Sequence, residues 1–208
     1  ITITHTTHSK YFANQLITRP DIILCALSGS RINAVPVANL TEYINAGGVF
    51  ICLHEDNFKS FITTLPGLSE VNITEGPINA AMPIIGPTDI ITNGSFGKGL
   101  VGKYWGATGT NQCVYMPNIS KVTVYSEYKG SPILFKHNEK NFLYCGDGGV
   151  LTNRSSTGYG RYPFSVNAST GYTPMTYAYG SQTVYNAALF GNIMEWAIHQ
   201  ATYHGINK

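Results

Sequence analysis

The chain has 208 residues, a length that fits one globular domain of ordinary to large size. Hydrophobic residues make up 43% and charged residues only 12%, which excludes an intrinsically disordered protein and leaves a surface built mostly from neutral polar side chains and tyrosine. The net charge is +2, the basic residues are dispersed, and no apolar run reaches the roughly 20 residues of a membrane span, so neither nucleic-acid binding nor membrane insertion is expected.

The first part of the chain alternates between predicted strands and helices. Near-continuous apolar runs indicate strands covered on both faces, and apolar residues at helical spacing indicate helices. The predicted elements are a strand over residues 1–5, a helix that ends before Pro20, a strand over 21–27, a helix over 35–46, a strand over 49–53 and a short helix over 58–65. This order is typical of βαβ units and predicts a parallel sheet.

The pattern changes in the second part of the chain. Residues 76–117 are rich in Gly and Pro and are predicted to be mostly loops. Three short strands with tight turns between them are then expected to pair as hairpins, followed by a long irregular segment and a final amphipathic helix. These elements are the strands 121–125, 131–135 and 141–145, the Tyr- and Gly-rich loop 154–184 and the helix that begins at residue 186 and ends near residue 204.

Together these elements predict one α/β domain over residues 1–208. We expect a three-layer α/β/α arrangement with a mostly parallel, flavodoxin-like sheet and an antiparallel C-terminal hairpin extension.

Three stretches carry a resemblance to a known family: residues 40–54, with a helix, Gly47-Gly48, a strand and His54; residues 89–97; and residues 141–153, followed by the last helix. In this order they resemble the class I glutamine amidotransferase-like superfamily, in particular its ThuA-like and related branches. The enzymes of that superfamily use a cysteine on a sharp strand-to-helix turn and a later His-x-Glu motif.

By position Cys52 matches that cysteine, but Phe50 and His54 stand where the sharp turn requires glycine. Asp147 and Asn153 stand where the His-x-Glu motif is expected. The resemblance therefore implies a branch without amidotransferase activity.

The four cysteines give no metal motif, because no two of them are spaced as CxxC. Cys25, Cys52 and Cys145 each lie inside an apolar run, so we expect them to be buried thiols. The alternative is that neighbouring strands bring two of them together as a disulfide. No metal ion and no cofactor is expected.

Polar residues follow the predicted strands at the edge where open parallel sheets bind ligands. They are His54, Glu55 and Asp56 after one strand and Asp147 and Asn153 after another. The capping of the next helix, for instance by Asp56, is the simplest role for such residues. A binding site at His54, Asp56, Asp147 and Asn153 is the second hypothesis, and acid–base catalysis by His54, Glu55 and Asp147 is the third.

The spacing of His5 and His8 permits a shared metal ion, but a solvated turn is the preferred interpretation. Aromatic residues form a second group of candidates. They are Tyr104, Trp105, Tyr159 and Tyr162. Such side chains either stack on sugars or a partner protein, or cover the sheet edge of the same domain.

The preferred functional hypothesis is a non-catalytic structural or adhesive module, which binds protein partners, itself or a glycan. Its expected location is extracellular, on a cell surface or a virion. The alternative is a hydrolase or a sugar-modifying enzyme with its site at the carboxyl ends of the strands. A third hypothesis, intermediate between these two, is a periplasmic or lumenal sugar-binding module.

Overall fold

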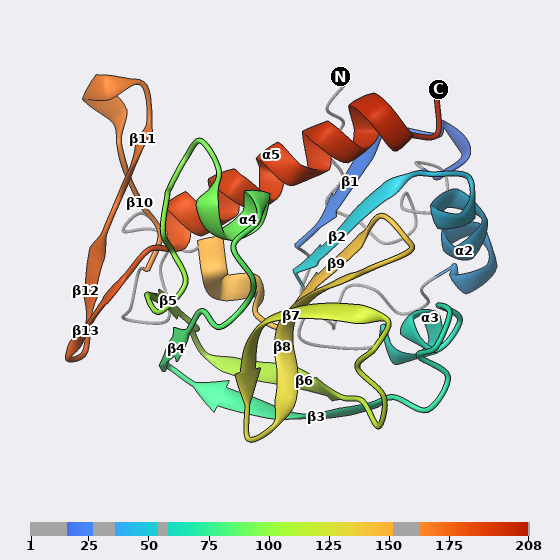
Figure 1. Cartoon of the computed structure of the whole chain (residues 1–208), viewed down its shortest axis with the longest axis horizontal. Coiled ribbons are helices and arrows are strands. Elements are labelled where there is room, and N and C mark those ends of the chain that lie inside the picture. The colour runs from blue at the N-terminus through green and yellow to red at the C-terminus, as the bar shows by residue number, and fades with distance from the viewer. Residues whose placement is uncertain (1–15, 27–35, 54–57, 152–162, 208) are drawn as a thin grey trace.

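The computed structural model describes residues 16–26, 36–53, 58–151 and 163–207. Its centre is a five-stranded sheet with the strand order β1-β2-β9-β8-β7 (Figure 1). The bounds are β1 (Ile22–Cys25), β2 (Val49–Leu53), β9 (Phe142–Cys145), β8 (Ser131–His137) and β7 (Val122–Tyr128). Strands β1, β2 and β9 are parallel, whereas β8 and β7 pair antiparallel with their neighbours.

The predicted βαβ unit is confirmed in the first part of the chain. Helix α2 (Val37–Asn45) connects β1 to β2 and buries one apolar face, and the short helix α3 (Lys59–Ile62) follows β2. Gly48 is needed at the end of this helix, because a Cβ atom there would lie 2.3 Å from the Tyr43 ring. The Tyr43 hydroxyl donates to the carbonyl of Pro20 at 2.8 Å and so joins the helix to the start of β1.

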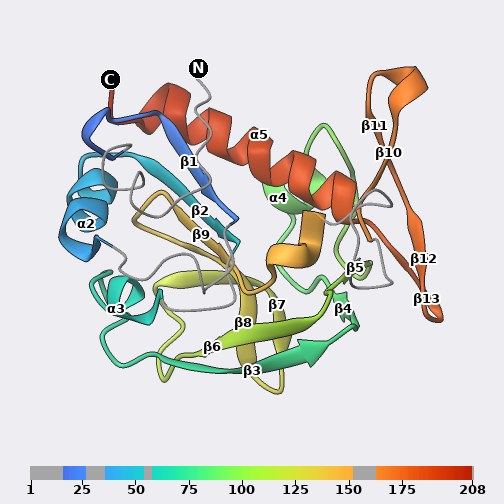
Figure 2. The same cartoon turned by 180° about the vertical axis from the view of Figure 1, so that it is seen from behind.

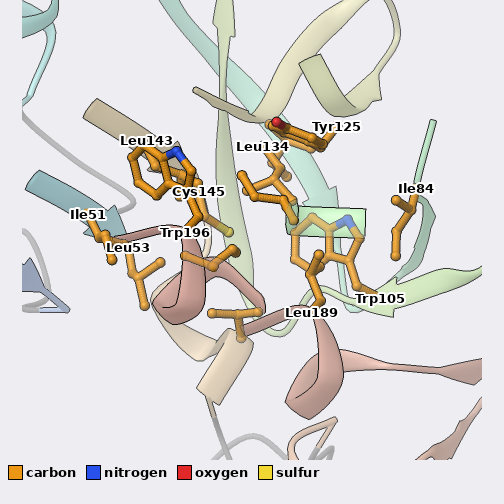
Figure 3. Close-up of a cluster of buried hydrophobic side chains, with 14 of the residues drawn as sticks. Ile51, Leu53, Ile84, Trp105, Tyr125, Leu134, Leu143, Cys145, Leu189 and Trp196 are labelled. Atoms are coloured by element: carbon orange, nitrogen blue, oxygen red, sulfur yellow. The ribbon is translucent and has the colours of Figure 1, made fainter. Parts of the chain in front are cut away.

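The central sheet separates two hydrophobic layers, because successive side chains of β2 point to opposite faces. Ile51 and Leu53 lie in one hydrophobic layer together with Trp196 of the long C-terminal helix α5 (Asn186–His204) (Figure 3). Phe50 and Cys52 pack into the second layer, which contains the buried residues of α2 and α3. The five residues of β2 are all buried, as the unbroken apolar run predicts.

The remaining strands form three smaller sheets beside the central one (Figure 2). Strands β3 and β6 form one pair, β12, β13, β5 and β4 form a four-stranded sheet in that order, and β10 and β11 form the other pair. The bounds are β3 (Asn72–Ile78), β4 (Ala81–Pro83), β5 (Tyr104–Gly106), β6 (Thr110–Tyr115), β10 (Ser165–Asn167), β11 (Thr173–Met175), β12 (Tyr177–Tyr179) and β13 (Gln182–Val184). Helix α4 (Ile90–Asn93) and the 3₁₀ turns η2 (Gly148–Leu151) and η3 (Ala168–Thr170) complete the described elements.

The predicted three-layer, flavodoxin-like fold with a mostly parallel sheet is wrong. Within the described residues the chain has 13 strands in four sheets and only four α-helices. Three strand pairings are parallel and six are antiparallel. The physical reason is connection length: short strands joined by short turns can pair only antiparallel, since a parallel pair needs a crossover of a dozen or more residues.

Two segments that were predicted as loops contain much of this additional sheet. Residues 76–117 contribute strands β4, β5 and β6 and the last three residues of β3, and the described part of the Tyr- and Gly-rich segment contributes β10 to β13. The hairpins of β7, β8 and β9 are confirmed. Lys129 and Gly130 form the first of their turns with φ values of 50° and 78°, as two-residue hairpin turns require. In the described part of the chain, no helix has the length and apolar character needed to cross a membrane.

Candidate functional site

The carboxyl ends of β2 and β9 lie side by side, because Leu53 is the register partner of Cys145 in the parallel pair. The predicted shared edge is therefore present at the point where Asp147 leaves β9. His54, Glu55, Asp56, Asn153, Tyr159 and Tyr162 lie outside the described residues, as do His5 and His8.

Asp147 is fully buried and its carboxylate is used by the backbone. Oδ2 accepts a hydrogen bond from the amide of Thr108 at 2.9 Å, and Oδ1 accepts one from the amide of Gly149 at 2.6 Å. Gly149 has no space for a side chain, since a Cβ atom would lie 1.7 Å from Thr108 Oγ1. Asp147 thus fixes the start of η2 to the loop between β5 and β6.

Asn186, the first residue of α5, also hydrogen-bonds backbone groups with its side chain next to this edge. Its Oδ1 accepts from the Gly106 amide at 2.7 Å, and its Nδ2 donates to the carbonyls of Gly106 and Val150 at 2.9 and 3.0 Å. The side chain is fully buried. Asn186 therefore ties β5, η2 and α5 together, and the polar groups here satisfy the backbone where elements meet.

The two described aromatic candidates do not form an exposed platform. Trp105 is fully buried and packs in the hydrophobic layer that faces α5 (Figure 3), while Tyr104 is half-buried on β5. This arrangement favours the alternative in which these side chains cover the sheet of their own domain.

The thiols are buried in the core and form no disulfide. Cys52 lies within β2 and not on a strand-to-helix turn. Burial raises its pKa well above the usual value, and the neighbouring Cys25 and Cys145 add to the effect. Burial also raises the pKa of Cys113 to about 12. These thiols are protonated at neutral pH, the opposite of what a nucleophilic cysteine requires.

In the described ranges, no group of three or more His, Cys, Asp or Glu side chains is placed to hold a metal ion. A polar cleft of about 430 Å³ instead lies at the other end of the central sheet, where β9 begins. Its walls come from the end of α2, the connection between β8 and β9, and the last turns of α5. The lining residues are Ile44, Asn45, Gly47, Lys136, His137, Asn138, Glu139, Lys140, Asn141, Trp196, Gln200 and His204.

Internal hydrogen bonds hold the walls of the polar cleft in place. Asn141 Nδ2 donates to the carbonyl of Gly47 at 2.9 Å and to that of His204 at 3.4 Å, and so links the ends of both helices to β9. The ring of His137 bonds Pro66 O through Nε2 at 3.0 Å, and its Nδ1 accepts from the amides of Glu139 and Lys140. Burial lowers the pKa of His137, in agreement with a neutral ring whose proton sits on Nε2.

Two charged residues of the cleft are already paired. Lys136 Nζ lies 3.2 Å from Asp89 Oδ2, and Glu139 forms an ion pair with Lys121. Lys140, Gln200 and Asn45 have side chains that hydrogen-bond to no other described residue, so they are available to a ligand. Sequence reasoning did not find this cleft, because its residues come from three distant parts of the chain.

The second surface feature is a hairpin, which we call the arm and define as β10, η3 and β11. It extends away from the rest of the protein in both views (Figures 1 and 2). Its base is held by an edge-to-face contact between Phe164 and Phe190 at 6.3 Å, while Tyr172 near its tip is 70% exposed and Met175 is 46% exposed. Residues 163–194, which include the arm, contain no charged side chain and no histidine.

No protein-family model, curated protein or solved structure matches this chain. The resemblance to the amidotransferase-like superfamily therefore stays a prediction.

Proposed function

We propose that this chain is a non-catalytic assembly module whose arm pairs with the arm of a second copy. The observation that carries the proposal is the arm: a two-stranded hairpin that leaves the body of the protein, exposes Tyr172 near its tip and Met175 at its base, and has no charge.

The edges of the arm are suited to pairing with another strand. In the described part of the chain β10 pairs only with β11, so each of the two strands has one edge with no strand beside it. Soluble proteins usually protect such edges with charged side chains or proline. Pro174 protects β11, whereas β10 has the sequence Ser-Val-Asn and contains neither a charged side chain nor a proline. Of the two edges of the arm, the edge of β10 is therefore, within the described residues, the one open to a partner strand.

A second copy of the chain is the partner that fits this edge. Two β10 strands related by a twofold axis pair antiparallel, and the two arms then form one four-stranded sheet. The low charge of the chain, +2 over 208 residues, opposes this approach only weakly. Because β10 has three residues, the contact is small, and we expect association to be weak and to depend on concentration.

The described residues at the carboxyl ends of β2 and β9 support a non-catalytic role. The carboxylate of Asp147 serves backbone amides, and Cys52 is a buried thiol with a raised pKa. We place such an assembly on a cell surface or a virion, where a neutral surface rich in Tyr, Thr and Asn suits close packing of copies.

Sedimentation velocity over a range of concentrations tests the proposal. The wild-type chain should show a sedimentation coefficient that rises with concentration. Val166→Lys should abolish the rise, because Val166 is the middle residue of β10 and twofold pairing of two such strands sets the two new charges beside each other. The matched control is Ile119→Lys, at an apolar site that is 56% exposed outside the arm, and it should associate like the wild type.

Two results would overturn the proposal. One is a wild-type chain that stays monomeric at every concentration. The other is an arm variant that associates as strongly as the Ile119→Lys control.

A further inference from the structure

We infer that the polar cleft between α2, α5 and the β8–β9 connection is a binding site for a carbohydrate of one or two sugar residues. The inference is independent of the arm, which is built from other residues. It rests on the size of the cleft, on the hydrogen-bonding groups in its walls and on its charge.

The size of the cleft suits a small ligand. A volume of about 430 Å³ falls within the range of small-molecule sites in proteins and leaves room for one or two sugar rings. The walls are also fixed before a ligand arrives, because Asn141 joins the ends of α2 and α5 and His137 anchors the β8–β9 connection. A preformed site loses little conformational entropy on binding.

The lining offers donors and acceptors close together, which is the pattern that neighbouring sugar hydroxyls require. The amides of Asn45 and Gln200 each present one carbonyl oxygen and one NH₂ group, and neither hydrogen-bonds to a described residue. The Oδ1 atom of Asn141 also remains available, since only its Nδ2 is used in the described structure. Trp196 and Ile44, which also line the cleft, are almost completely buried, so the accessible lining is mainly polar.

The charge of the lining distinguishes between sugars. Lys136 is paired with Asp89 and Glu139 with Lys121, so Lys140 is the cleft lysine that keeps an ammonium group without a carboxylate partner among the described residues. A sugar that carries one carboxylate should therefore bind more tightly than its neutral counterpart, by a factor that falls as salt is added.

Nuclear magnetic resonance of the ¹⁵N-labelled full chain tests the inference, because the side-chain amides of Asn45 and Gln200 give their own signals. The probes are glucose, N-acetylglucosamine, cellobiose, glucuronic acid and N-acetylneuraminic acid, each added up to about 50 mM, well above a millimolar Kd. At least one probe should shift these signals to saturation, and glucuronic acid should bind more tightly than glucose.

The variants Gln200→Ala and Lys140→Ala test the location of binding. Gln200→Ala should raise Kd about tenfold for every bound sugar, whereas Lys140→Ala should raise it only for the acidic ones. Gln182→Ala and Lys129→Ala, which replace the same residue types outside the cleft, should change nothing. The inference is overturned if no probe gives saturable shifts, if the shifts lie outside the cleft, or if both cleft variants bind like their controls.

Discussion

The substitution Asp147→Ala separates a structural role of this residue from a catalytic one. The carboxylate accepts two hydrogen bonds from backbone amides, those of Thr108 and Gly149, and it is fully buried. A hydrogen bond to a charged group contributes roughly 1.5–3 kcal/mol. Loss of both should lower the free energy of unfolding by about 3–6 kcal/mol, a large part of the roughly 5–15 kcal/mol that stabilises a domain. Asp147→Asn keeps one acceptor oxygen and should lower it by about half as much.

Urea unfolding followed by tryptophan fluorescence measures these changes. The control is Glu127→Gln, which makes the same acid-to-amide change at an exposed position on β7 and should stay within about 0.5 kcal/mol of the wild type. A catalytic acid held in place for chemistry often gives the opposite sign, since its removal relieves unfavourable electrostatics. Equal or greater stability of the Asp147→Asn protein would refute the structural role.

Three further outcomes follow from buried contacts. Gly48→Ala should lower the free energy of unfolding by about 1–3 kcal/mol in the same urea assay, because the new methyl group overlaps the Tyr43 ring; unchanged stability would contradict that packing. Cys52 and Cys113 should react with a thiol reagent only after unfolding, because burial raises both pKa values, and rapid labelling of the native protein would contradict their burial. Because the pKa of His137 is lowered in the folded protein, the unfolded chain takes up a proton first as the pH falls below 6.5. The stability that the neutral ring contributes should therefore be present above that pH and be lost as the pH falls towards the lower folded pKa. His137→Gln should flatten this part of the curve of unfolding free energy against pH, and an unchanged curve would contradict a buried neutral ring.

Much of the central layer could be predicted from local sequence pattern. The five apolar residues of β2 and the apolar spacing of α5 give elements with the predicted bounds, because burial on both faces and a helical repeat each leave a clear signal. Lys129-Gly130 likewise marks the turn of the β7–β8 hairpin, since both residues adopt a positive φ.

The smaller sheets could not be predicted in the same way. Strands β4, β5 and β10 to β13 have three residues each, too few for an alternating pattern to stand out. Pro83 and Pro174 lie inside such strands although proline usually argues against a strand, and both are tolerated because β4 and β11 lie at sheet edges. Strands of three residues take part in three of the six antiparallel pairings.

The candidate sites also differ in how far they could be predicted from the sequence. The shared edge of β2 and β9 could be inferred from two apolar runs, but the polar cleft could not, because Asn45, Lys140 and Gln200 come together only through the packing of α2 and α5. The arm did leave a signal in the sequence: residues 163–194 contain no charge, in a segment that otherwise has the composition of an exposed loop.

Hydrogen–deuterium exchange of the arm at low and high protein concentration tests the assembly role most directly. Pairing of two β10 strands predicts that the amides of residues 165–167 exchange more slowly as concentration rises, while the exposed loop around Ile119 exchanges at the same rate throughout. Exchange in the arm that does not change with concentration, in a sample shown to associate, would place the contact elsewhere and contradict the account.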